Sequence, residues 1–368
     1  MCATGVKTLL IVGPQPPSIG GSPATVQAIL NELGKHPSYQ AILVNTSPPL
    51  DYSKKKMRGL STEKLRRAVL IGSRYVRGIG HSDAVLVFAN NLFTLTLVPL
   101  LFLFARLSRK PFYLKPVGGD LGLYIGSRKE PLRSYLLYVL RSLDGILAQT
   151  RDLQKALRGF GCANVYYVPG CRPLPQIAEL LTTSTEGLRL IFLSQITREK
   201  GAFVLLDALQ LLERESSARV VCDFYGPIFE EDREDFVRQV EATASARYCG
   251  LVEAEAASCL IAGYDALILP THFVSEGHPG VIIEAMMAGV PVISTRHGSI
   301  PDLIAHGENG LLVPVRDSRA LAEAITQIAL DHNQRKRMGE ANFARGHEFR
   351  TDVVVPKMLG IMFRTQVE

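Results

Sequence analysis

The chain has 368 residues, of which 47% are hydrophobic and 21% charged. This balance is typical of a globular protein with enough apolar material for two cores, and it excludes a disordered chain. The longest apolar stretch, Leu92–Ala105, contains Pro99 and falls short of the ~20 residues that span a bilayer. We therefore expect no transmembrane helix and interpret the stretch as a buried helix, with Asn90 and Asn91 as N-cap residues.

The net charge of +6 conceals an asymmetry along the chain. Residues 1–170 contain 22 Lys and Arg against 8 Asp and Glu, whereas residues 171–368 contain 19 against 27. The basic excess is densest between Tyr52 and Arg77, where Glu63 is the one acidic residue. Such a patch attracts anionic lipid headgroups or an acidic substrate, and it is equally typical of a solvated basic face. Nucleic acid is not an expected partner, because no known binding motif accompanies the charges.

The six cysteines form no CxxC pair and no metal-ligand spacing, so we expect free thiols in a reducing compartment. The N-terminus leads directly into an apolar run without the pattern of a signal peptide. We therefore expect a cytoplasmic protein, with any membrane contact peripheral and on the cytoplasmic face.

Apolar runs bounded by turn residues alternate with amphipathic stretches in the first half of the chain. This alternation is typical of a parallel sheet with helices on both faces. The predicted strands are Lys7–Val12, Gln40–Val44, Ala84–Phe88, Phe112–Lys115, Gly145–Gln149 and Asn164–Val168.

Pro169–Pro175 predicts a hinge and Thr182–Thr185 a polar link, after which the pattern restarts. The predicted strands are then Leu188–Leu193, Val220–Tyr225, Asp265–Leu269, Val290–Ser294 and Leu311–Val313, and the predicted helices Gly201–Glu213, Val281–Ala288 and Ser318–Leu330. We predict two doubly wound domains, residues 1–170 and 188–348, with a linker over 171–187. Ligands of such sheets bind at the carboxyl ends of the strands, so the cleft between the sheets is the expected site.

The segment from Leu269 to Asp317 contains the most residues suited to ligand binding. The loop Ser275–Gly280 ends where a helix begins, and the free amides of Gly280 and Val281 would favour a phosphate there. Glu276 in the loop and Glu284 on the helix can accept hydrogen bonds from sugar or ribose hydroxyls. For an isolated pair of glutamates, a solvated surface would be the simpler interpretation.

The run from Glu276 to Ile293 resembles the E-x7-E signature of glycosyltransferase family 4. Gly298–Ile304 and Asn309–Val313 resemble the family's G-G-I-P-E-I-I and N-G-L-L-V segments. The resemblance implies the GT-B fold, two Rossmann-like domains facing each other across a cleft. It also implies transfer of a sugar from a nucleotide sugar with retention of anomeric configuration, and a C-terminal helix, residues 349–368, that packs back on the first domain.

Carried over residue by residue, the resemblance implies that Glu284 holds the donor ribose and that Glu276 contacts the transferred sugar. The amides near Gly280 and Val281 would bind the distal phosphate. His278 and Pro279 belong to the same donor-binding loop.

The run from Phe192 to Gly201 resembles the family's strand and G-R-x-x-x-E-K-G loop. Lys200 matches the lysine that stabilises the departing diphosphate, where a fixed cation lowers the barrier. Gln195 stands where the family often has arginine, which is a departure from the pattern. Either Lys200 and the helix N-terminus suffice, or another cation such as Arg198 helps.

Two loops of the first domain resemble the same family less closely. Pro16–Ser22 resembles the P-P-x-x-G-G loop, which implies that Gly20 and Gly21 face the donor phosphates and sugar. Lys115–Asp120 resembles a G-G-D variant of a loop in which many relatives have a histidine. Asp120 would then bind a sugar hydroxyl, although an N-cap or turn role is an equal alternative.

Arg247–Val252 resembles the strand and loop beside the donor base, which Leu251 and Val252 would contact largely through their backbone. The resemblance is close from Leu188 to Leu330 and looser over the first 170 residues.

The sequence thus predicts a retaining glycosyltransferase that uses a UDP- or GDP-sugar and no other cofactor. No DxD pair follows a strand, so no metal is expected. The expected acceptor is a glycan or lipid-linked glycan of surface polysaccharide biosynthesis, with peripheral contact to an anionic membrane suggested by the basic first domain. The alternatives are another GT-B enzyme, such as a nucleotide-sugar epimerase or a disaccharide synthase, and a degenerate, non-catalytic GT-B binding module. Gln195 and the missing histidine favour the last alternative, whereas Glu276, Glu284 and Lys200 argue against it.

Overall fold

The computed structural model describes residues 5–16, 21–47, 62–175, 187–215 and 219–364. The chain divides into two compact units, residues 1–173 with 351–368 and residues 174–350, here called unit 1 and unit 2. Each unit is built on one six-stranded sheet with parallel strand pairs. The predicted α/β class, with two Rossmann-like domains, is confirmed.

The sheet of unit 1 has the strand order β2-β1-β3-β4-β5-β6. Its strands are β1 Lys7–Gly13, β2 Tyr39–Asn45, β3 Ala84–Ala89, β4 Phe112–Pro116, β5 Gly145–Ala148 and β6 Val165–Tyr167. Its helices are α1 Gly21–Leu33, α2 Thr62–Ile79, α3 Asn91–Thr96, α4 Val98–Leu107, α5 Leu121–Gly126, α6 Leu132–Ser142, α7 Arg151–Gly159 and α15 Thr351–Phe363.

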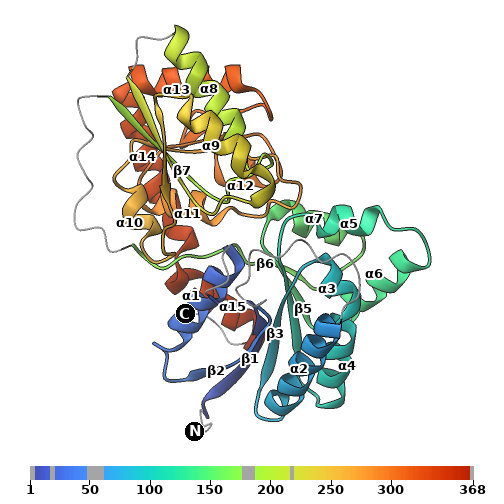
Figure 1. Cartoon of the computed structure of the whole chain (residues 1–368). Coiled ribbons are helices and arrows are strands. Elements are labelled where there is room, and N and C mark those ends of the chain that lie inside the picture. Colours follow the sequence, from blue (N-terminus) through green and yellow to red (C-terminus); the bar gives the residue numbers. More distant parts are fainter. Residues whose placement is uncertain (1–4, 17–20, 48–61, 176–186, 216–218, 365–368) are drawn as a thin grey trace. The chain divides into compact units, whose positions relative to one another are not determined.

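Alternate residues of the unit 1 strands supply two cores, one on each face of the sheet. Leu10 and Val12 of β1 pack with α2, α4, α6 and α7, whereas Leu9 and Ile11 pack with α1 and α15. Figure 1 shows α2 and α4 on one side of this sheet and α1 and α15 on the other. Because both faces are covered, the strands are apolar runs without polar alternation. The last helix, α15, is tied to this unit by the hydroxyl of Tyr113, which donates to the Met362 carbonyl at 3.0 Å.

The sheet of unit 2 has the order β12-β11-β10-β7-β8-β9. Its strands are β7 Leu188–Leu193, β8 Val220–Tyr225, β9 Ala246–Gly250, β10 Ala266–Leu269, β11 Val292–Thr295 and β12 Gly310–Val313. Its helices are α8 Ala202–Glu215, α9 Arg233–Glu241, α10 Ala257–Ile261, α11 Gly280–Met287, α12 Ile300–Leu303, α13 Ser318–Leu330 and α14 His332–Gly346, with 3-10 turns at Glu230–Asp232 and His347–Phe349.

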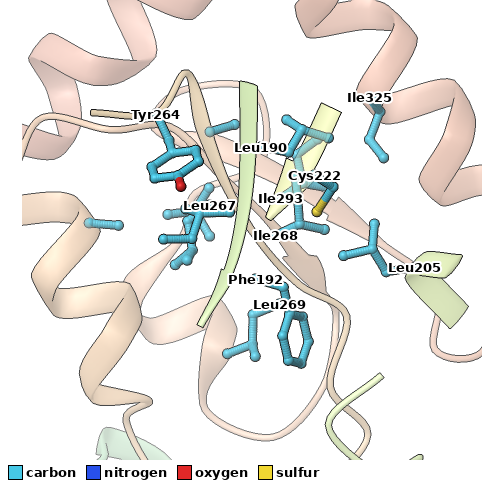
Figure 2. Close-up of a cluster of buried hydrophobic side chains, with 14 of the residues drawn as sticks. Leu190, Phe192, Leu205, Cys222, Tyr264, Leu267, Ile268, Leu269, Ile293 and Ile325 are labelled. Atoms are coloured by element: carbon cyan, nitrogen blue, oxygen red, sulfur yellow. The ribbon is translucent and has the colours of Figure 1, made fainter. Parts of the chain in front are cut away.

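One continuous core holds the central strands of unit 2. Figure 2 shows Leu190 and Phe192 of β7 beside Leu267 and Leu269 of β10, with Leu205 of α8 among the surrounding side chains. These strand residues are 0–1% exposed. The carboxyl ends of β7 and β10 are therefore fixed in position, and the loops that follow them start from a rigid base.

The stretch Leu92–Ala105 corrects our expectation of a single buried helix. It forms two helices, α3 and α4, and Asn90 caps the first by accepting the amide of Phe93 at 2.9 Å. Pro99 lies in the first turn of α4, where its missing N–H costs no hydrogen bond. Val98, Leu101 and Ala105 are buried, but Leu92, Leu100, Leu103, Phe104 and Leu107 are exposed.

The described helices include none with the length and hydropathy that crossing a bilayer requires. The five cysteines that the structure describes all carry free thiols, as expected.

Candidate functional site

The candidate site of unit 2 lies where the strand order of the sheet reverses, between β7 and β10. From β7 the sheet continues through β8 to β9 on one side, whereas β10, its other neighbour, leads to β11 and β12. The loops after β7 and β10 therefore diverge from adjacent strand ends. Open parallel sheets bind their ligands at this kind of switch point.

Lys200, from the loop after β7, meets Glu276, from the loop after β10. The Lys200 Nζ lies 2.7 Å from Glu276 Oε2, which also accepts the Thr271 hydroxyl at 2.9 Å. The Lys200 ammonium also lies 4.7 Å from the centre of the Phe273 ring. The side chains of Lys200 and Glu276 are only 16% and 8% exposed, so their attraction is weakly screened by water. The structure thus joins a cation and a carboxylate that lie far apart in the sequence.

Gly201 allows the two loops to approach each other. Its φ of +86° is a left-handed conformation, and a Cβ there would lie 2.1 Å from the Pro270 carbonyl oxygen. The His272 amide donates to the Glu199 carbonyl at 2.8 Å and completes the contact. A glycine directly after Lys200 is therefore required by the backbone of this site.

The N-terminus of α11 is a second feature of the site. Pro279 is the N-cap residue and its side chain supplies no cap, and the Ile282 amide is the first to donate back, to Pro279 at 3.1 Å. The amides of Gly280 and Val281 precede this bond, so the dipole and the first-turn amides suit an anion. Glu284 lies on the next turn of the same helix and is 8% exposed.

Three residues from the end of β11 and from the segment that follows it hold the Glu276 loop in place. The Thr295 hydroxyl donates to the Thr271 carbonyl, the Ser299 hydroxyl donates to the Gly277 carbonyl at 2.5 Å, and His297 Nε2 lies 3.1 Å from the Phe273 carbonyl. These residues were not predicted as site residues from the sequence. Their positions in or just before the family-like segment Gly298–Ile304 were the available signal.

Two histidines of the segment after β10, His272 and His278, lie in partly or fully buried positions. The His278 side chain is fully buried, with its ring 6.0 Å from that of Phe349, so any donor contact of His278 falls to its backbone. Pro279 beside it is likewise buried. Burial and then the charge of Arg316 lower the pKa of His272, which keeps this imidazole neutral near pH 7.

Gln195, Leu251 and Val252 also follow strands of this sheet. Gln195 and Val252 are half-buried, whereas Leu251 is 64% exposed. The Gly226 amide donates to the Gly250 carbonyl at 2.8 Å and joins the ends of β8 and β9. These residues share the carboxyl edge of the sheet with Lys200, but they make no contact with it that the structure records among the described residues.

Arg198, the other cation suggested for the site, pairs with acidic residues outside the two loops. Its guanidinium lies 2.5 Å from Asp235 and 3.4 Å from Asp232, and it stacks over the Phe203 ring at 4.2 Å. The side chain is thereby engaged with α9 and its preceding turn. Within the described residues, Lys200 is the cation that pairs with Glu276.

In unit 1, Asp120 follows β4 and meets a residue that follows β3. Asp120 occupies the N-cap position of α5, but its side chain makes no capping hydrogen bond. Its carboxylate accepts the Asn91 side-chain amide at 2.8 Å. Asn91 was not predicted as a partner from the sequence, because only the pairing of β3 with β4 brings the two loops together.

The other unit 1 predictions are only partly within the described residues. Gly21 begins α1 and is exposed, whereas Gly20 lies outside the described residues, as do Lys54, Lys55, Lys56 and Arg58. Arg67 donates to the Ser47 carbonyl at 2.6 Å and so supports the loop after β2.

Lys115 is a buried cation that the sequence analysis did not single out. It is 4% exposed, its Nζ donates to the Val168 carbonyl at 2.7 Å, and burial lowers its pKa to about 8.

Across the described parts of both units, no group of three or more His, Cys, Asp or Glu side chains is arranged to hold a metal ion.

Comparison with known proteins agrees with the fold. The chain matches Anabaena HepE, solved in complex with UDP, over 98% of this chain and 100% of that chain, with a TM-score of 0.71 at 15% identity. The two Rossmann-like sheets and this likeness define a protein of the GT-B fold. Residues 179–345, a little under half of the chain, match the family model described as glycosyl transferases group 1.

Curated relatives match over part of the chain. The putative colanic acid biosynthesis glycosyltransferase WcaL of Salmonella typhimurium is 30% identical over 152 residues, 40% of this chain and 37% of WcaL. The amylovoran biosynthesis glycosyltransferase AmsK of Erwinia amylovora is 29% identical over 152 residues, 39% of this chain and 36% of AmsK. The matched region thus spans little more than a third of these relatives.

Proposed function

We propose that this protein is a retaining glycosyltransferase that moves a sugar from a nucleotide diphosphate sugar to a glycan or lipid-linked glycan acceptor in surface polysaccharide biosynthesis. The observation that carries the proposal is the Lys200–Glu276 pair at the switch point of unit 2, with the N-terminus of α11 beginning four residues beyond Glu276. The pair supplies a cation for a diphosphate and a carboxylate for sugar hydroxyls.

The reaction uses these groups in defined roles. The bond between the anomeric carbon and the diphosphate oxygen breaks, and an acceptor oxygen forms the new bond on the same face of the sugar while passing its proton to the departing diphosphate oxygen. The diphosphate leaves with growing negative charge, which Lys200 and the amides of Gly280 and Val281 would stabilise. Glu276 would hold hydroxyls of the transferred sugar and Glu284 those of the ribose.

The proposed transfer needs no metal ion, because Lys200 and the helix N-terminus supply the positive charge. A uracil nucleotide is the first donor class to test, since HepE was solved with UDP. Relatives named for colanic acid and amylovoran biosynthesis support a polysaccharide acceptor. The basic excess of residues 1–170 supports an acidic or lipid-phosphate-linked acceptor at an anionic membrane.

A donor screen tests the proposal. The purified chain is mixed with UDP-, GDP- and ADP-sugars in the presence of EDTA, and thermal stabilisation and nucleotide release are measured. We expect one donor class to stabilise the protein, and Glu284→Ala and Lys200→Ala to weaken that effect. Arg198→Ala is the matched control, because Arg198 lies two residues from Lys200 but pairs with α9.

The products separate the alternatives. Transfer to a glycan or lipid-linked acceptor, with retained anomeric configuration by NMR, supports the proposal. Conversion of the donor alone would indicate an epimerase, and transfer to a free sugar or sugar phosphate a disaccharide synthase. No response to any donor would instead favour a non-catalytic binding module.

A further inference from the structure

An exposed apolar stripe runs along α4 in unit 1. Leu100, Leu103, Phe104 and Leu107 follow the i, i+3, i+4, i+7 spacing of one helix face and are 56%, 55%, 44% and 72% exposed. The opposite face of the helix is already buried, through Val98, Leu101 and Ala105. Helix α4 therefore has a second apolar face that the packing of unit 1 does not use. A continuous apolar face of this kind marks an interaction surface.

The neighbouring helix α2 also carries exposed apolar residues and positive charge. The two helices lie side by side (Figure 1), and the Tyr75 hydroxyl of α2 donates to the Leu101 carbonyl of α4 at 2.8 Å. Val69 and Val76, seven residues apart on α2, are 63% and 47% exposed. The exposed arginines of the two helices are Arg66, Arg74, Arg77 and Arg106.

Almost no acid offsets these arginines. Between Glu63 and Asp120 the chain has one acidic residue, Asp83, whose carboxylate accepts the Thr8 amide at 2.8 Å. The surface thus combines large apolar side chains with uncompensated positive charge. Helices that lie in the headgroup layer of a bilayer have this combination, with the apolar side chains inserted and the cations among anionic headgroups.

We propose that α4 and α2 form a docking surface for a bilayer that contains anionic phospholipid. The stripe Leu100, Leu103, Phe104 and Leu107 enters the acyl boundary, and the arginines bind the headgroups. A second copy of this surface fits less well, because it would bring like charges together. An acidic glycan would match the arginines but leave the stripe exposed. The inference deepens the membrane part of the proposed function but does not depend on the sugar transfer, since it rests on residues outside the donor site.

The docking has two components that respond differently to salt. Headgroup attraction is screened once the Debye length falls to a few ångströms, whereas apolar insertion persists. Flotation of the full chain with vesicles of phosphatidylglycerol and phosphatidylcholine in equal amounts, and of phosphatidylcholine alone, measures both. We expect binding to the anionic vesicles, weakened but retained at high salt, and weaker binding to the neutral ones.

Variants on each component make the test specific. Leu103→Ser/Phe104→Ser/Leu107→Ser should lower the partition coefficient at least about tenfold, because each change removes apolar area from the acyl boundary. Arg74→Ser/Arg77→Ser should lower it about tenfold at low salt and less at high salt. Leu330→Ser is the matched control, since Leu330 is 78% exposed on α13 of unit 2, and it should bind as the parent chain does.

Circular dichroism on the same preparations shows whether the variants fold. Donor-induced thermal shifts show whether they bind the donor, which separates this inference from the sugar transfer. Absence of a donor response with normal flotation would count against the transfer alone. The docking surface is overturned if the parent chain does not float, if the triple serine variant floats unchanged, or if the parent chain forms a dimer that this variant dissolves.

Discussion

The two units share a sheet architecture but differ in where their functional signals lie. In unit 2 the signals are local and tied to the backbone. Lys200 is followed by Gly201, where the positive φ and the nearby Pro270 carbonyl require a glycine. Glu276 is held by Lys200 and Thr271. In unit 1 they are dispersed over a surface, as positive charge and an apolar stripe. A site for a small charged ligand needs fixed atoms, whereas a lipid surface needs only area and sign of charge.

The largest expected effect is in unit 2. Replacing Lys200 by Met should lower kcat/KM about 10²–10³-fold, because the leaving diphosphate loses its cation. Steady-state kinetics with the donor identified by the screen measures this. Glu276→Gln should also lower kcat/KM, and the double variant should lose less than the product of the two single effects, because the side chains are paired.

Arg198→Ala is the control in the same loop and should keep kcat/KM close to that of the parent chain. Equal losses in Arg198→Ala and Lys200→Met would show that disorder of the loop, and not the missing cation, causes the effect. The assignment of the unit 2 function to one fixed cation, Lys200, would then be wrong.

The backbone requirement at Gly201 is the next comparison. Gly201 and Gly250 have φ of +86° and +89°, but a Cβ on Gly201 meets Pro270, whereas one on Gly250 has nothing within 4 Å. Gly201→Ala should lower the free energy of unfolding by roughly 3 kcal/mol, and Gly250→Ala by roughly 1 kcal/mol, the cost of the left-handed conformation alone. Denaturant titration measures both, and similar losses in the two variants would mean that the loops after β7 and β10 adjust without strain.

The fold could be predicted from the sequence largely because apolar runs in covered sheets are local signals. The bounds of β7, β8 and α13 coincide with the predicted ranges. The error at Leu92–Ala105 has a physical reason: apolar content alone does not show that α4 has two apolar faces, one against the sheet and one exposed.

The candidate site was predictable only in part, because some of its signals are local in the sequence and others are not. Glu276, Glu284 and Lys200 stand in sequence motifs, whereas the contacts around them depend on residues far along the chain. Arg198 is held by Asp232 and Asp235, and Asn91 by Asp120, across 29 to 37 residues. The spacing of these residues in the sequence does not predict such pairs unless the strand order is known.

Lys115 gives unit 1 a pH dependence of stability. Its pKa is about 8 in the folded chain and near 10.5 when unfolded, so between these values the unfolded state binds more protons. The free energy of unfolding should therefore rise by about 2 kcal/mol from pH 8 to pH 10 through this group. Urea titrations at several pH values measure this, and Lys115→Met should remove that rise. An unchanged pH profile in the variant would show that Lys115 keeps its charge when folded.

The smallest expected effect concerns two adjacent asparagines of unit 1. Asn90→Ala removes the cap of α3 and Asn91→Ala removes the hydrogen bond to Asp120, and each should cost about 1 kcal/mol of stability. Only Asn91→Ala leaves the Asp120 carboxylate without this support. If Asp120 binds a sugar hydroxyl, Asn91→Ala should lower kcat/KM several-fold while Asn90→Ala leaves it nearly unchanged. Equal kinetics in the two variants would assign Asp120 to the turn before α5 and leave unit 2 as the source of the sugar contacts.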